Sequence, residues 1–309
     1  MPGDDREDAP KAEGRIAAVN APHALLAAIV DYAGLFPPAG LDMAHAVRNY
    51  AEYHASDDAW MLGRFVVPAG RLDEFRAARS SVADDTPWRL SALLGEDVAR
   101  DVDRVARFNA RVDGATVDCL EGRVAATDDV AALAALPVDA FSVFCELPFR
   151  ADPAPFLPAL RRVGFNAKLR TGGVTAAAFP PAVWLVEVMR ACIDAGVAFK
   201  ATAGLHHPIR GPYRLTYADG AASAVMYGYL NVFLAAAFLT NGMSDDDALT
   251  LISEPHASAF SLSADGVSWR GHVIATDTIR AARERVATSF GSCSFREPVD
   301  ELRALAVRV

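Results

Sequence analysis

The sequence has no cluster of lysine or arginine residues, and this absence excludes the usual partners of basic proteins. Its 309 residues carry a formal net charge of -9 at pH 7. Nucleic acids and anionic membrane surfaces select basic patches, so we expect neither as a partner. A small anionic substrate is the partner that the other features below favour.

Cysteine is also scarce, and no CxxC pair occurs among Cys119, Cys145, Cys192 and Cys293. This pattern excludes a disulfide framework and a cysteine zinc site, and it predicts reduced thiols in the cytoplasm. The first residues, MPGDDREDAPKAEGR, have no apolar core and resemble neither a secretory signal nor a basic presequence. We expect a disordered acidic tail over residues 1–20 and one domain over 21–309.

Common cofactor motifs are missing as well. No GxGxxG follows the first expected strand, no GxxxxGK[ST] occurs, and HExxH and HxH are absent. These absences weaken a nucleotide-binding open sheet and a metalloprotease-like site, and we expect no cofactor. One apolar stretch, Ala221–Gly242, is near the roughly 20 residues of a membrane span. It is alanine-rich and has no cationic flank, so we expect a helix in the core or at a homo-oligomer interface, and no membrane.

What the sequence does contain is a regular alternation of short apolar runs and helical patterns. The expected strands are Ala28–Tyr32, Met61–Val67, Arg89–Leu94, Ala115–Leu120, Phe141–Leu147, Asn166–Arg170 and Ala198–Ala203. An eighth strand is expected within 258–269, where Asp265-Gly266 is typical of a hairpin turn. The best-marked helix, Pro180–Ala195, begins at prolines and ends at Gly196. This alternation predicts an α/β fold, a single (β/α)₈ barrel of the TIM type.

Charged residues recur at one phase of the expected strands. Side chains alternate between the two faces of a strand, and the inward face near the carboxyl end of a barrel strand lines the active site. Cys119 and Cys145 are expected to face the helices. The inward set is Asp31, Arg64, Asp118, Glu146, Lys168, Arg170, Lys200 and Thr202. Burying unpaired charges costs several kcal/mol, so these residues must pair with each other or with a ligand.

Two of these inward residues are lysines on successive strands. Adjacent strands lie roughly 4.8 Å apart, so the ammonium groups of Lys168 and Lys200 can approach closely. A like charge and a dry pocket lower a lysine pKa, and a neutral amine can form a Schiff base with a carbonyl. We therefore expect Lys168 to be a nucleophile and Lys200 to modulate it.

The segments AKLRTGG and FKATAG resemble the two lysine motifs of the deoxyribose-phosphate aldolases, and TVDCLEG is similar to a third strand of that family. The resemblance implies a Schiff-base aldolase barrel in which Lys168 forms the imine, Lys200 lowers its pKa, and Asp118 transfers protons. We assign Glu146 to proton handling as well. The phosphate-binding Gly-Gly of the family is replaced by ATAGLHHPIR, so Arg64, Arg170 and Arg210 are expected to bind a carboxylate instead.

Other readings of the same residues remain open. Adjacent residues of an extended segment point apart, so one of His206 and His207 is expected to face the site, as a proton shuttle, a metal ligand or a loop histidine. A divalent metal held by Asp31, Asp118, Glu146 and a histidine would suit a metal-dependent lyase or isomerase. A barrel that binds an anionic metabolite without transforming it is the non-enzymatic alternative. Under the lyase hypothesis, Asp31, Thr202 and His206 are expected to contact the substrate.

Overall fold

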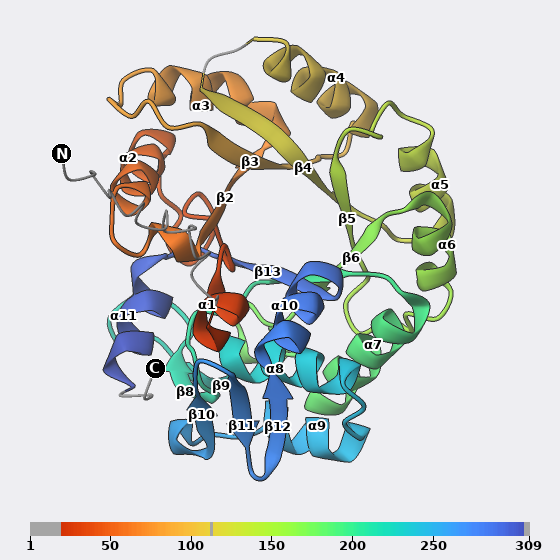
Figure 1. Cartoon of the computed structure of the whole chain (residues 1–309). Helices are drawn as coiled ribbons and strands as arrows, with labels where there is room; N and C mark the ends of the chain where they lie inside the picture. The colour runs from red at the N-terminus through yellow and green to blue at the C-terminus, as the bar shows by residue number, and fades with distance from the viewer. Residues whose placement is uncertain (1–19, 112–113, 306–309) are drawn as a thin grey trace, which may run out of the picture.

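Apolar strands and amphipathic helices alternate along the chain and close into a barrel of eight parallel strands, seen along its axis in Figure 1. The computed structural model describes residues 20–111 and 114–305. The predicted acidic tail lies, except for residue 20, outside the described residues. Around the ring the strands follow the order β1-β2-β3-β4-β5-β6-β7-β13, which confirms the predicted (β/α)₈ barrel class.

The barrel strands match the predicted ones closely for the first seven. Their bounds are β1 Val30–Tyr32, β2 Leu62–Pro68, β3 Trp88–Leu93, β4 Ala115–Arg123, β5 Ser142–Glu146, β6 Asn166–Arg170, β7 Phe199–Thr202 and β13 Ala287–Ser292. The helices are α1 Ala21–Leu26, α2 Met43–His54, α3 Leu72–Arg79, α4 Val98–Asn109, α5 Thr127–Ala134, α6 Phe156–Val163, α7 Ala182–Ala195, α8 Tyr229–Thr240, α9 Asp245–Ile252, α10 Thr276–Arg285 and α11 Arg296–Ala304. Short 3₁₀ turns lie at Ala59–Met61, Ala69–Arg71, Ala176–Ala178 and Ala257–Ala259.

The eighth barrel strand is not where the sequence predicted it. Residues 258–269 form β10 (Phe260–Leu262) and β11 (Gly266–Trp269), which are antiparallel and are joined by β12 (His272–Ala275) in a separate sheet. The expected hairpin at Asp265-Gly266 is therefore present, but outside the barrel. Strand β13 closes the ring instead, pairing with β1 and β7. Its sequence, ATSFGS, is rich in small residues and carries little apolar signal.

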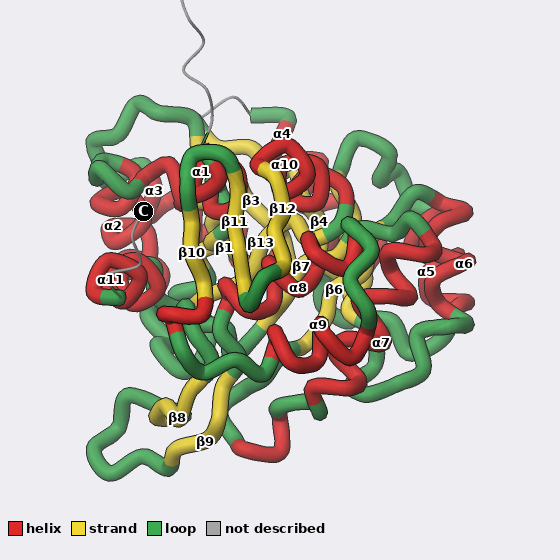
Figure 2. The backbone as a smooth tube through the Cα atoms, turned by 60° about the horizontal axis from the view of Figure 1, so that its bottom comes forward, coloured by secondary structure: helices red, strands yellow, loops and turns green. Residues whose placement is uncertain are grey.

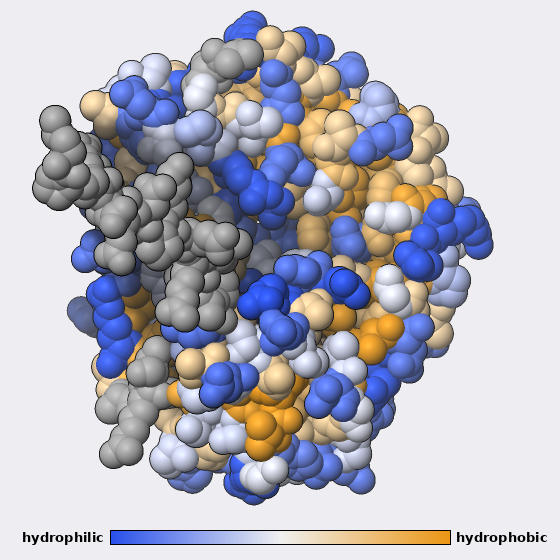
Figure 3. Space-filling view, viewed as in Figure 1, coloured by the Kyte–Doolittle hydropathy of each residue, from blue (hydrophilic) through white to orange (hydrophobic). Residues whose placement is uncertain are grey.

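The connection from β7 to β13 is the longest in the chain. It contains the β8–β9 hairpin (Gly211–Arg214 and Ser223–Met226), helices α8 and α9, the small sheet and α10. Figure 2 shows the β8–β9 hairpin extending away from the barrel strands. On the barrel end that faces the reader in Figure 1, hydrophilic side chains gather around the middle of the surface (Figure 3).

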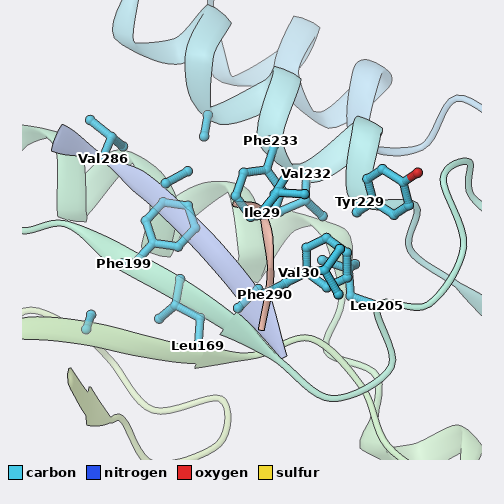
Figure 4. Close-up of a cluster of buried hydrophobic side chains, with 14 of the residues drawn as sticks. Ile29, Val30, Leu169, Phe199, Leu205, Tyr229, Val232, Phe233, Val286 and Phe290 are labelled. Carbon is cyan, nitrogen blue, oxygen red and sulfur yellow. The ribbon is translucent and has the colours of Figure 1, made fainter. Parts of the chain in front are cut away.

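Helix α8 is the most apolar helix and lies in the core. All of its residues from Tyr229 to Leu239 are buried. Phe290 of β13 stacks on Tyr229 with ring centroids 5.1 Å apart and also contacts Phe233 at 5.9 Å. Figure 4 shows these rings together with apolar side chains of β1, β6 and β7. The stretch Ala221–Gly242, predicted to be a helix in the core or at an interface, is thus a core helix from Tyr229 onward, whereas Ser223–Met226 forms strand β9.

Within the described residues, the segment that passes a length and composition test for a membrane span is 176–195, which contains α7. Its most apolar window is 39% buried, and core helices pass the same test. Helix α7 packs Leu185, Val188 and Met189 inside, and Gly196 ends it in the left-handed region with φ of 61°. The predicted end of this helix at Gly196 is confirmed.

The role of β13 as the closing strand can be tested at Phe290, which is fully buried. Replacement of a buried phenylalanine by alanine removes apolar contacts and leaves a cavity, so Phe290→Ala should lower the free energy of unfolding by about 3–5 kcal/mol. Val273→Ala, on β12 with 69% of its surface exposed, is the control and should change it by less than about 0.5 kcal/mol. Denaturant unfolding measures both, and equal effects would contradict the closure.

Candidate active site

A cavity of about 1510 Å³ opens at the carboxyl ends of the barrel strands. Each of the eight strands contributes a lining residue at or just beyond its carboxyl end: Ala33, Pro68, Leu93, Arg123, Glu146, Arg170, Thr202 and Gly291. Phe36, Pro37 and Pro38 of the loop after β1 also line it. This is the end of a (β/α)₈ barrel at which active sites are found.

A buried glutamate lies at the floor of this cavity, between the two lysines. Oε1 of Glu121, on β4, is 2.6 Å from Nζ of Lys200, and Oε2 is 2.8 Å from Nζ of Lys168. Ser91 on β3 donates a third hydrogen bond to this carboxylate, to Oε1 at 2.6 Å. The side chain of Glu121 is only 3% exposed, so its charge depends on these partners.

Each of the two lysines also contacts a second carboxylate. Lys200 also contacts Oδ2 of Asp31 at 2.7 Å, and Ser289 of β13 donates to the same oxygen. Lys168 also contacts Oε2 of Glu146 at 3.0 Å, and Arg170 donates to Oε1 of Glu146 from Nη2 at 2.8 Å. We call the alternating series the interior ion chain; its members are Asp31, Lys200, Glu121, Lys168, Glu146 and Arg170.

Within the interior ion chain, the neighbouring charges shift the pKa values of the members. Burial alone would raise the pKa of Glu121, but Lys168 and Lys200 outweigh burial and hold this pKa well below its usual range. Burial alone would lower the pKa of Lys200, but Asp31 and Glu121 outweigh it and raise this pKa. Lys168 and Arg170 lower the pKa of Glu146 against the same effect of burial. Glu121 and Lys200 are therefore charged at neutral pH.

This arrangement changes the predicted role of Lys200. The sequence suggested that the two ammonium groups weaken each other's hold on a proton. Instead, Glu121 lies between them, and Lys200 is a firmly charged group that keeps Glu121 ionised.

Lysine is rare in this chain, and its placement is selective. The sequence has 30 lysine and arginine residues, of which only Lys11, Lys168 and Lys200 are lysines. Lys11 lies outside the described residues. The other two pair in register across β6 and β7, and both line the cavity. Outside the barrel interior, the basic residues of the described chain other than histidine are arginines, whereas these two interior residues carry primary amines.

The other predicted catalytic residues divide into two groups. Glu146 lies in the cavity with the lysines. Asp118 does not line it, because its carboxylate is held by Nε of Arg64 at 2.6 Å and by Nε of Arg89 at 2.7 Å. Arg64 and Arg89 lie near the amino ends of β2 and β3, on the opposite side of the barrel from its mouth. Asp118 and Arg64 thus form an ion pair outside the cavity.

The predicted substrate contacts divide in the same way. Arg170, Thr202 and His206 line the cavity. Asp31 does not line the cavity, because its carboxylate lies beneath Lys200 and accepts hydrogen bonds from Lys200 and from the backbone N–H of Arg64. Arg210 also lies outside the lining, with its guanidinium donating to the carbonyl of Ser253 at 3.3 Å.

Sequence reasoning missed Glu121 because β4 is irregular. Leu90 of β3 pairs with Val117, but Ser91 pairs with Cys119, so Asp118 is an extra residue that shifts the alternation of side chains. Cys119 and Glu121 consequently face the interior, which makes the prediction that Cys119 faces the helices wrong. The strand also runs three residues further than predicted, to Arg123.

Both histidines after β7 line the cavity wall, although one was expected. The ring of His206 is 3.0 Å from Oγ of Ser292, and burial lowers its pKa to about 4. His207 contacts the carboxylate of Glu301 at 2.8 Å. Glu297, four residues earlier on α11, is also close, and burial raises the pKa of this carboxyl. The sequence offered an i, i+4 spacing of two glutamates as the sole signal for them.

The metal ligands suggested by the sequence do not gather at one point. Asp31 and Glu146 each hold a lysine of the interior ion chain, and Asp118 holds two arginines. Among the described residues, the group whose ligand atoms all lie within 4.8 Å of one another is His207, Glu297 and Glu301.

Comparisons with known proteins give no match: no family model, no curated protein and no solved structure matches this chain. The fold and the geometry of the cavity therefore carry the functional argument alone.

Replacement of Glu121 by glutamine tests the interior ion chain. Removing one partner of a buried ion pair leaves uncompensated charge, so Glu121→Gln should cost about 3–5 kcal/mol of folding stability at pH 7. Glu74→Gln removes an exposed pair with Arg71 and should cost less than about 1 kcal/mol. Equilibrium denaturation measures both.

The pH dependence supplies a second readout. Because the folded-state pKa of Glu121 is depressed, its contribution is present above the unfolded value of about 4.3 and is lost as pH falls below it. The stability gap between the wild type and Glu121→Gln should therefore narrow below pH 4. A gap that stays constant down to pH 2 would contradict the assigned charges.

Proposed function

We propose that this barrel is a lyase that forms a Schiff base between Lys168 and a small anionic carbonyl substrate. The observation that carries the proposal is the position of Lys168. It is a rare primary amine on the floor of the cavity, at the carboxyl end of the barrel, with a carboxylate on each side.

Lys168 is favoured over Lys200 by its surroundings. The amine of Lys200 is 2% exposed at its side chain and is bound by Asp31 and Glu121, which raise its pKa. Lys168 is 6% exposed at its side chain and has Glu146 as a second partner, itself 11% exposed. A substrate in the cavity can reach Lys168 and Glu146 together, while Lys200 keeps Glu121 ionised.

Arg170 supports the anionic character of the substrate. Its Nε and Nη2 both donate to a single oxygen of Glu146, and Nη1 has no hydrogen-bond partner among the described residues. The side chain is 32% exposed and lines the cavity. A guanidinium with free donors is a suitable ligand for a carboxylate, and charge-assisted bonds of this kind are among the strongest in proteins.

The chemistry follows from the neighbours of Lys168. Glu146 takes a proton from the ammonium, and the free amine adds to the carbonyl carbon to form a carbon–nitrogen bond. The protonated Glu146 returns its proton to the former carbonyl oxygen, and that oxygen takes a second proton from the added nitrogen and leaves as water, which gives an iminium ion. The iminium then accepts the electron pair of the bond between its neighbouring carbon and the next carbon. As that bond breaks, Glu146 removes the proton from the hydroxyl group of the departing carbon, so the products are a carbonyl compound and an enamine on Lys168. This scheme agrees with the resemblance to class I aldolases at Lys168, but it gives the proton transfer to Glu146 rather than to Asp118.

Reduction of an imine tests the proposal directly. Incubation of the full chain with pyruvate and sodium borohydride should fix a reduced adduct on Lys168, because borohydride converts the imine to a stable amine. Peptide mapping by mass spectrometry is unambiguous, since the sequence has three lysines. Lys168→Arg keeps the positive charge between Glu121 and Glu146 but cannot form an imine, so it should fold and carry no adduct.

The matched control is Lys200→Arg, which keeps the charge beneath Glu121 and should still be labelled at Lys168. Labelling that persists in Lys168→Arg at a lysine of the barrel would disprove the assignment of the nucleophile. A folded protein that no 2-oxo acid or hydroxyaldehyde labels would support the non-enzymatic alternative.

The role of Arg170 can be separated from imine formation by a pair of probes. Arg170→Gln should raise the pyruvate concentration needed for half-maximal labelling roughly 10- to 100-fold, because a charge-assisted bond contributes about 1.5–3 kcal/mol. Glycolaldehyde has no carboxylate, and its labelling should change by less than about threefold. If the variant weakens both probes equally, Arg170 acts on Glu146 alone and the anion site lies elsewhere.

A further inference from the structure

A second cluster of ionisable side chains lies on the wall of the same cavity, apart from the interior ion chain. It consists of His207 in the segment after β7 and of Glu297 and Glu301 on α11. The glutamates are four residues apart, which places both carboxylates on one face of the helix. We call these three residues the rim cluster.

The rim cluster is held in place by neighbouring side chains. The ring of His207 stacks on Tyr213 with centroids 3.5 Å apart and an interplanar angle of 9°. Its Nδ1 lies 2.8 Å from a carboxylate oxygen of Glu301. The hydroxyl of Tyr217 donates to Oε2 of Glu297 at 3.0 Å. Such outer contacts orient the ligands of metal sites and restrict their motion.

The rim cluster differs from the interior ion chain in its charge balance. In the interior, each carboxylate has a lysine or arginine partner. In the described part of the chain, the ion-pair partners of Glu297 and Glu301 are histidines alone: His206 at 3.7 Å and His207 at 2.8 Å. Two carboxylates thus lie close together without a lysine or arginine partner among the described residues.

We propose that the rim cluster binds a divalent transition-metal cation through Nδ1 of His207 and one oxygen each from Glu297 and Glu301. An imidazole with two carboxylates is a donor set suited to Zn²⁺, and Mn²⁺ accepts the same oxygens. Three protein ligands leave coordination positions open, which is the pattern of catalytic rather than structural sites. His207 and Glu297 line the cavity, so the open positions face any molecule bound there.

A cation in this position would polarise a carbonyl or a bound water at the wall of the cavity. This inference stands apart from the Schiff-base proposal, because it uses none of the residues of the interior ion chain. Each can fail without the other.

Metal binding by the full chain tests the inference. After treatment with a chelator and its removal, the wild type should bind one equivalent of Zn²⁺ by isothermal titration calorimetry, and elemental analysis should find the metal after dialysis. Glu301→Gln and His207→Gln should each weaken binding about 100-fold or more, since ligand loss costs at least as much as loss of an outer contact. Titration with Mn²⁺, followed by electron paramagnetic resonance, should show competition for the same site.

Two further variants serve as a control and as a test of the residue that orients Glu297. Asp300→Asn changes an exposed carboxylate on the same helix, α11, and should leave Zn²⁺ binding unchanged. Tyr217→Phe removes the hydroxyl that orients Glu297 from a side chain whose residue is 49% exposed, so it should fold normally and bind Zn²⁺ about 10-fold more weakly.

Two results would overturn the proposal. The first is a folded wild type that binds neither Zn²⁺ nor Mn²⁺. The second is binding that survives in Glu301→Gln and is lost in Cys293→Ser, because Cys293 lies 3.9 Å from His206 and the two would then hold the metal instead.

Discussion

The contact of one carboxylate with two ammonium groups is the interaction on which the interior of this barrel depends. Glu121 receives Lys168 on one oxygen and Lys200 on the other, and it has almost no contact with solvent. Moving a charge out of water costs several kcal/mol, which no single partner fully offsets. The alternation of acids and bases in the interior ion chain spreads that cost over six residues whose charges sum to zero.

The same balance gives the two lysines different surroundings. Lys200 has a raised pKa and is enclosed by Asp31 and Glu121, so it acts as a fixed positive charge. Lys168 lies between Glu121 and Glu146, and Nη1 of Arg170, at the end of the series, has no hydrogen-bond partner among the described residues. Fixed charges that need no rearrangement during a reaction are the main source of electrostatic catalysis.

Much of this architecture could be predicted from the sequence, for reasons that are local. The first seven barrel strands each carry recurring apolar residues, and the alternation within β6 and β7 places Lys168, Arg170 and Lys200 inward without further information. Asp31 and Glu146 follow from the same rule. Where pairing is regular, the phase of a strand determines which side chains meet.

The features that were not predicted from the sequence have equally specific causes. The extra residue in β4 changes which side chains face inward after Asp118, and neither a bulge nor its position can be read from TVDCLEG alone. Strand β13 is hidden because Ser289 and Gly291 are small where Phe290 is the main apolar anchor. The rim cluster joins residues about ninety positions apart, His207 and Glu297, whose approach depends on the closure of the barrel.

A contribution to folding stability does not by itself explain why the barrel interior is charged. A buried ion network is often no more stable than well-packed apolar side chains of similar volume. Most barrels fill their interior with branched apolar residues, whereas this chain places two of its three lysines there, against an open cavity. The rim cluster adds two carboxylates whose ion-pair partners, in the described part of the chain, are histidines, and one of the two, Glu297, lines that cavity. One cavity therefore brings together amines, free guanidinium donors and candidate metal ligands, a combination that the proposed activation of a carbonyl group would use and that packing alone does not require.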